Sequence, residues 1–122
     1  MGDFRKLDAW RHADNVTCDV YRATRKFPRE EQFGLVSQLR RAGVSVGSNI
    51  AGGCGRNNNG DFARSLSIAL VSANELLYLL ILANDLEYFT DEGLTDRADQ
   101  SCRMLFRLHE KVQRDRHISR RR

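Results

Sequence analysis

The stretch that decides the fold is residues 32–56, QFGLVSQLRRAGVSVGSNIAGGCGR, which is followed closely by the apolar run at residues 62–83. In the first segment, paired arginines, two glycines one turn apart and an asparagine accompany an apolar stripe with helical spacing. The second segment is apolar on nearly every side. Together they predict a helical bundle that forms oligomers and has a basic end, and they do not indicate an enzyme.

Composition predicts one domain. A chain of 122 residues that is 41% hydrophobic can bury about two-thirds of its unfolded surface in one core, with no room for a second. The first residues, MGDFRKLDAWRHAD, are charged and lack the apolar core of a signal peptide, so we expect a cytoplasmic protein. The longest apolar run, residues 76–83, is far shorter than a bilayer span, so no membrane association is expected.

Four segments have helical periodicity. The first covers residues 7–26, and Pro28 fits the first turn of the second. A glycine- and asparagine-rich turn at residues 52–60 separates the second helix from a third that begins near Asp61, with an asparagine as its cap. Residues 90–92 open the fourth. The expected inner stripe of the third helix is Phe62, Leu66, Ala69, Ala73, Leu76, Leu80 and Ala83, and that of the fourth is Leu94, Ala98, Cys102, Leu105, Leu108 and Val112.

Short connections between long helices predict an all-α, antiparallel up-down-up-down four-helix bundle over residues 1–113. Residues 114–122, RDRHISRRR, hold five arginines and one aspartate and form a basic tail that accounts for the whole net charge of +4. This topology brings both termini and the turn between the second and third helices to one end, which is therefore predicted to be basic. At the other end, basic and acidic turns are expected to neutralise each other.

The third helix has too many apolar residues to bury against the other helices of one bundle. A helix that is apolar all round needs neighbours all round, so we expect a homo-oligomer. The alternative is that this helix is simply the central helix of a tightly packed monomer.

Basic residues are the candidate nucleic-acid ligands, since phosphate contacts give a salt-sensitive attraction that does not depend on sequence. The alternative is that they are solvated or make ion pairs with glutamates. Asn49 and Glu75, beside the apolar stripes of adjacent helices, are expected to form a structural polar pair in the core. The candidate ligands are Arg40, Arg41, Arg56, Arg64, Arg107, Lys111, Arg114, Arg116, Arg120, Arg121 and Arg122.

Catalytic and metal sites are not expected. The three cysteines are far apart and share no metal-binding spacing with the three histidines, so we expect neither a metal nor a cofactor. One alternative is a bundle-type ribonuclease. In that case Arg103 would steady a phosphate and His109, six residues later, would move a proton.

Three segments carry a resemblance to a known family: FRKLDAW at residues 4–10, residues 27–56, and FARSLSIALVSANEL at residues 62–76. In this order they resemble the four-helix-bundle family of 23S rRNA intervening-sequence proteins, over about residues 4–112. Members are often encoded inside insertions in large-subunit ribosomal RNA genes and are described as ribosomal-type proteins. The family is also similar in fold to an accessory protein of diversity-generating retroelements, a barrel-like pentamer that binds nucleic acid and its reverse transcriptase.

What the resemblance implies is a four-helix bundle, a pentamer and a nucleic-acid-associated role without established catalysis. One position departs from the pattern. Relatives commonly have glutamate two residues after the isoleucine at position 50, and this chain has Gly52, so a role of that carboxylate does not carry over. We therefore predict a non-catalytic oligomer that binds RNA or ribonucleoprotein through its basic end, and the alternative is a protein-interaction adaptor.

Overall fold

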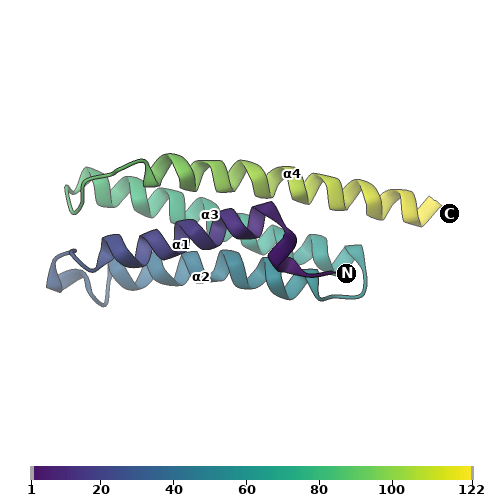
Figure 1. Ribbon diagram of the computed structural model, residues 1–122, viewed down its shortest axis with the longest axis horizontal. Helices are drawn as coiled ribbons and strands as arrows, with labels where there is room; N and C mark the ends of the chain where they lie inside the picture. The colour runs from purple at the N-terminus through teal and green to yellow at the C-terminus, as the bar shows by residue number, and fades with distance from the viewer. Residues whose placement is uncertain (1, 122) are drawn as a thin grey trace.

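The computed structural model describes residues 2–121, with side chains up to His117 (Figure 1). Regular structure in this part of the chain is entirely helical. In chain order the elements are η1 (Phe4–Lys6), α1 (Asp8–Thr24), η2 (Arg29–Glu31), α2 (Leu35–Cys54), α3 (Asn59–Asp85) and α4 (Leu94–Arg121). The elements η1 and η2 are short 3-10 helices.

The four α-helices form the predicted antiparallel bundle. Each packs against its neighbours in the sequence, and α4 closes the bundle by packing against α1. The N-terminus, the turn between α2 and α3 and the end of α4 lie together, and we call this the terminal end. The connections at residues 25–34 and 86–93 lie at the opposite end, which we call the loop end (Figure 1).

The core consists of two clusters of buried side chains, one toward each end. Leu66 and Leu105 anchor the terminal-end cluster, and Leu39 and Leu80 anchor the loop-end cluster; each is at most 1% exposed. The inner stripe predicted for α3 is buried throughout, and that of α4 is buried except for the half-buried Leu108. Helical spacing of apolar residues therefore identified the core correctly.

The turn between α2 and α3 depends on one cap and one close approach. The side chain of Asn58 accepts a hydrogen bond of 2.8 Å from the Asp61 N–H, which confirms that an asparagine caps α3. A Cβ atom on Gly53 would lie only 2.5 Å from the Cβ of Ser65. Glycine at position 53 therefore lets α2 and α3 meet closely just before the turn.

Two helix boundaries differ from the prediction. Pro28 directly precedes η2, which begins at Arg29, and α2 starts only at Leu35. The side chain of Glu31 explains this start, because it accepts a hydrogen bond from the Leu35 N–H at 3.2 Å and also one from the Tyr88 hydroxyl at 2.8 Å. At the other end of the chain, α4 continues without a break through the predicted tail to Arg121.

Among the described residues, α3 is the one helix whose length and composition could span a membrane. In the bundle, its inner side packs against α2 and α4 and supplies much of the core. Its outer side keeps Ile68, Val71 and Tyr78 exposed. The absence of membrane association remains a prediction.

Asp91 caps the start of α4, and its carboxylate should make the free energy of unfolding depend on pH in the acidic range. Its carboxylate accepts hydrogen bonds from the N–H groups of Leu94 (2.7 Å) and Thr95 (3.3 Å). Burial alone would raise the pKa of Asp91, but hydrogen bonds from Thr95, Leu94 and Gly93 outweigh it and lower the pKa. We expect Asp91→Ala to lower the free energy of unfolding by about 1 kcal/mol at pH 7.

The sign of the pH effect follows from the lowered pKa. The carboxylate stabilises the fold above the unfolded pKa of an aspartate, and this contribution disappears as the pH falls through the lower folded value. Urea denaturation at pH 7 and again at a strongly acidic pH should therefore show the two proteins converging in acid. An equal difference at both pH values would contradict this role.

Candidate nucleic-acid interface

Exposed basic side chains gather at the terminal end. Arg56 lies in the turn after α2, and Arg64 is on the first turns of α3. The last part of α4 adds Arg107, Lys111 and Arg114, all exposed. Because α4 is one continuous helix, residues 107 and 114, seven positions apart, lie on the same outer face about 10 Å from each other.

Arg116 connects the end of α4 to the start of α3. A Cβ atom on Gly60 would lie 3.5 Å from the Nε of Arg116, so this guanidinium rests beside the first turn of α3. The basic residues at the end of α4 therefore lie near the turn between α2 and α3, which holds Arg56. Three further predicted ligands, Arg120, Arg121 and Arg122, have side chains outside the described part of the structure.

The basic residues near the N-terminus are largely paired. Arg5 and Asp3 form an ion pair of 2.9 Å, and hydrogen bonds from the Arg5 side chain hold the pKa of Asp3 below its usual range. Arg11 bonds to the side chain of Asp8 and donates to the Arg5 carbonyl oxygen at 2.8 Å. The segment therefore adds less positive field than its arginines suggest, and α4 dominates the terminal end.

Arg40 is a structural residue. Its Nε donates to the Thr24 hydroxyl at 2.9 Å, a terminal nitrogen donates to the Tyr21 carbonyl oxygen at 3.3 Å, and the guanidinium lies 4.7 Å from the centre of the Tyr21 ring. These contacts join α2 to α1, so the predicted phosphate role of Arg40 is not supported. Arg41 is exposed, but it lies midway along α2 and not at the terminal end.

The predicted core pair of Asn49 and Glu75 is wrong. The Asn49 amide donates to the Ser45 carbonyl oxygen at 2.8 Å, within its own helix, and Glu75 is exposed. The polar contact between α2 and α3 is instead a hydrogen bond of 2.8 Å between the hydroxyls of Ser45 and Ser72. Small serines fit where two helices approach closely, whereas a glutamate would have to bury a charge.

The ribonuclease alternative has no geometric support. Six residues along a helix correspond to a rotation of roughly 240°, so Arg103 and His109 leave α4 on different sides. Arg103 forms an ion pair of 3.3 Å with Asp99, whereas Nε2 of His109 bonds to the Ser67 hydroxyl at 3.0 Å. The two side chains do not converge on a common point, and each has a contact of its own.

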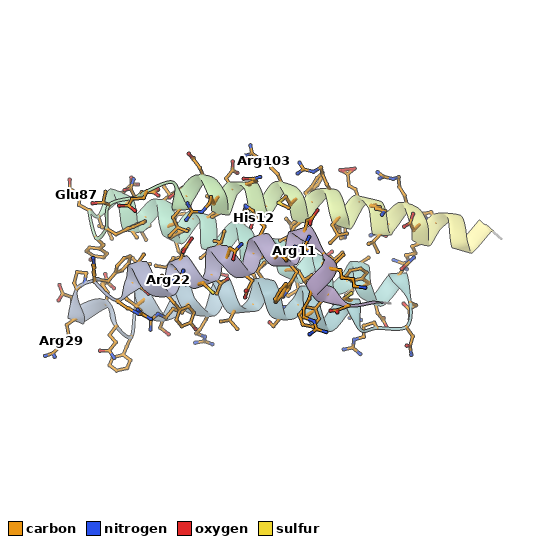
Figure 2. The ribbon with its side chains drawn as sticks, viewed as in Figure 1. Arg11, His12, Arg22, Arg29, Glu87 and Arg103 are labelled. Atoms are coloured by element: carbon orange, nitrogen blue, oxygen red, sulfur yellow. The ribbon has the colours of Figure 1, made fainter. Side chains whose placement is uncertain are left out.

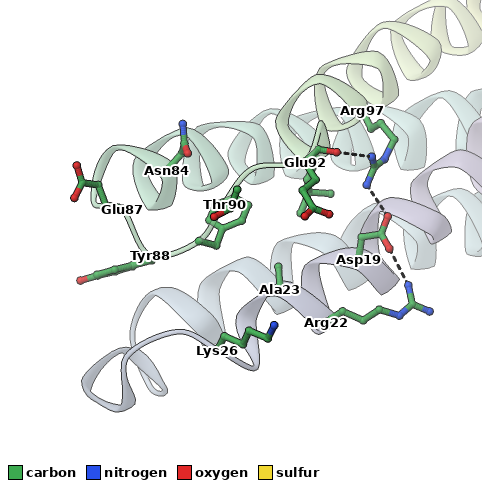
Figure 3. A pocket seen from close by; sticks show the side chains of 12 residues that line it. Asp19, Arg22, Ala23, Lys26, Asn84, Glu87, Tyr88, Thr90, Glu92 and Arg97 are labelled. Atoms are coloured by element: carbon green, nitrogen blue, oxygen red, sulfur yellow. Dashed lines mark hydrogen bonds and ion pairs between the residues drawn. The ribbon is translucent and has the colours of Figure 1, made fainter.

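Polar contacts that were not expected from the sequence fasten α4 to α1. His12 and Ser101 share a hydrogen bond of 2.7 Å between Nδ1 and the hydroxyl. Asp19 on α1 bonds Arg22 at 2.8 Å and Arg97 at 2.7 Å, and Figure 3 shows its carboxylate between the two guanidinium groups. The sequence signal for these contacts was the position of His12 and Asp19 beside the apolar stripe of the first helix.

A pocket of about 900 Å³ opens at the loop end, between α1 and the connection from α3 to α4 (Figure 3). Its charged lining is balanced. The cations are Arg22, Lys26 and Arg97, and the anions are Asp19, Glu87 and Glu92. Figure 2 shows Arg22, Arg29 and Glu87 toward this end of the bundle. The loop end therefore mixes both signs, as expected. At the terminal end carboxylates are also present, at Asp3, Asp8, Asp61, Glu110 and Asp115, but basic residues outnumber them.

The comparisons with known proteins agree with this bundle. The sequence pattern that defines the family described as 23S rRNA-intervening sequence protein matches residues 5–108. The chain belongs to this family. Among curated proteins, no significant relative is found.

One solved structure of the same fold is a crystal structure from Bacteroides thetaiotaomicron, a protein with unknown function from the S23 ribosomal protein family. It is 24% identical, with a TM-score of 0.75, and the match covers 84% of this chain and 95% of that chain. At this identity the likeness establishes the shared fold. The family name and the fold therefore agree, and both fit the resemblance seen in the sequence.

Proposed function

We propose that this protein is a non-catalytic, oligomeric four-helix-bundle protein that binds RNA, alone or within a ribonucleoprotein, through its terminal end. The oligomer size implied by the resemblance is a pentamer. The binding residues are those that remain exposed at that end: Arg56, Arg64, Arg107, Lys111 and Arg114, joined by Arg116 and the last arginines of the chain.

The observation that carries the proposal is the separation of charge along the bundle. Basic residues at the terminal end are exposed and come from the turn after α2, from α3 and from α4, whereas Arg22, Lys26 and Arg97 at the loop end share one pocket with three carboxylates. A continuous helix holds the α4 residues in a fixed row before any ligand arrives, so little conformational entropy is lost on binding. The name of the family, which refers to ribosomal RNA, supports the choice of RNA.

The competing function is a protein-interaction adaptor. Its support is the apolar outer side of α3, where Val71 is 68% exposed and Tyr78 is 60% exposed. An apolar interface responds little to salt, whereas binding to phosphates weakens steeply as salt rises. Salt dependence therefore separates the two functions.

The experiment is a titration of RNA and of DNA with the purified protein over a series of salt concentrations, using the full chain and a chain that lacks residues 114–122. Val112 is the last buried residue described in α4, so the deletion leaves the core intact. We expect the slope of log K against log salt to become shallower by about 0.7–0.9 for each removed arginine that contacts a phosphate.

Two results would overturn the proposal. One is an absence of binding by the full chain at low salt, which would leave the adaptor function. The other is a slope that the deletion does not change, which would remove Arg114, Arg116 and the last arginines of the chain from the proposed surface. Circular dichroism of both proteins checks that the shorter chain is still folded.

A further inference from the structure

The outer side of α3 is an exposed apolar ridge. Ile68, Val71 and Tyr78 follow one another at helical spacing and are 50%, 68% and 60% exposed. Glu75 lies in the same row, is exposed, and makes no ion pair within the described residues. A row of large apolar side chains around one carboxylate is typical of a surface that another molecule covers.

The outer side of α2 has the opposite shape. Val44 is a 49% exposed apolar residue, whereas Ser48 and Gly52 beside it are exposed and small, and a Cβ atom on Gly52 would meet nothing within 4 Å. Arg41 continues this row toward the loop end and likewise has no ion-pair partner among the described residues. Helix α2 therefore presents a shallow surface with one cation, and large side chains of a second helix fit such a surface.

The two rows also match in height along the bundle. The hydrogen bond between Ser45 and Ser72 shows that these residues are level. Arg41 is four residues from Ser45, and Glu75 is three residues from Ser72, both toward the loop end. At about 1.5 Å per residue, the cation and the carboxylate are level to within about 2 Å.

We propose that the occupant of the α3 ridge is the outer side of α2 in a second copy of this chain. In this contact, Ile68 and Val71 cover Val44, Ser48 and Gly52 of α2, and Glu75 pairs with the partner copy's Arg41. Two different surfaces meet, so the interface is heterologous and each copy has one free half for the next. Because the two rows are level along the bundle axis, each copy adds to the last without a shift along that axis. Successive copies can then close into a ring and do not form an open helical filament.

This inference rests on the proposed homo-oligomer and not on RNA binding. Its test uses one variant for each half of the interface. Val71→Glu places a charge on the ridge, and Ser48→Trp fills the shallow surface; both positions are exposed, so the fold should survive. Phe33→Ala is the control, because Phe33 is 90% exposed but lies in the connection at the loop end. Mass is measured by sedimentation at a concentration where the wild-type chain is assembled.

We expect each interface variant alone to have the mass of one chain and the control to keep the wild-type mass. Mixed in equal amounts, the two variants should form a particle of two chains, because each supplies the half that the other lacks. Full assembly by Ser48→Trp would overturn the inference, since the interface would then pair α3 with α3. A mixture that remains single chains, or a monomeric wild-type protein, would also overturn it.

Charge reversal supplies a second test that does not depend on steric effects. Arg41→Glu and Glu75→Arg should each weaken assembly, and the double variant should restore it; a double variant weaker than both singles would contradict the pairing. RNA binding is measured separately on the Val71→Glu chain, whose basic terminal end is unchanged. Assembly of the wild-type chain without RNA binding would refute the RNA binding alone, and RNA binding by a wild-type chain that stays monomeric would refute the homo-oligomer and this interface together.

Discussion

Replacing Arg107, Lys111 and Arg114 together with glutamine is expected to weaken RNA binding about 100-fold at physiological salt. Each lost phosphate contact lowers the slope of log K against log salt by about 0.7–0.9, and three contacts at about 0.15 M salt give this factor. The three side chains are exposed on α4, so their replacement should not disturb the core. Fluorescence anisotropy of a labelled RNA over a salt series measures both the affinity and the slope.

The matched control makes the same change in charge at the loop end. Arg22, Arg25 and Arg29 are also exposed, but they lie at the loop end, where the pocket that Arg22 lines also holds Asp19, Glu87 and Glu92. Replacing these arginines with glutamine should leave the slope nearly unchanged. If the two triple variants lost the same affinity, the attraction would come from total charge and not from the terminal end.

Leu66→Ala should lower the free energy of unfolding by about 3–4 kcal/mol, the largest stability effect that we expect from one truncation. Leu66 is fully buried in the terminal-end cluster, so the smaller side chain would leave a cavity between helices. Equilibrium urea denaturation of the Val71→Glu chain, if it is monomeric, gives the value without a contribution from assembly.

Phe33→Ala in the same background tests whether burial is the cause. It removes a larger side chain, but Phe33 is 90% exposed, so the expected change is below about 0.5 kcal/mol. A cost for Leu66→Ala as small as that of the control would mean that the core does not have the packing described here.

The sequence predicted the bundle because its information is periodic. Apolar residues every three to four positions mark the buried side of each helix, and short connections leave little choice of topology. Boundaries were less certain, because they depend on individual side chains. Pro28 suits a helix start in general, but the contact of Glu31 with the Leu35 N–H, supported by Tyr88 from a distant connection, moves the start of α2.

The candidate site was predictable only at the level of where charge collects. Topology places α4 and the turn after α2 at one end, so a basic terminal end follows from the order of helices. The order of helices does not show which arginines are free to bind a ligand. Arg40, for example, donates hydrogen bonds to Thr24 and Tyr21 of another helix. The Asn49 amide likewise donates to the Ser45 carbonyl oxygen, one turn back in its own helix. This local hydrogen bond satisfies the amide without Glu75 of another helix.

The closure of α4 against α1 has a consequence for how the chain reaches this structure. All other contacts between α-helices join neighbours in the sequence, so contact order is low and we expect folding within roughly microseconds to milliseconds. The packing of α4 against α3, and the seam that holds His12 to Ser101 and Asp19 to Arg97, must wait for the last helix to be synthesised. During translation, α1, α2 and α3 can therefore assemble first, and the helix that carries the most exposed arginines completes the bundle last.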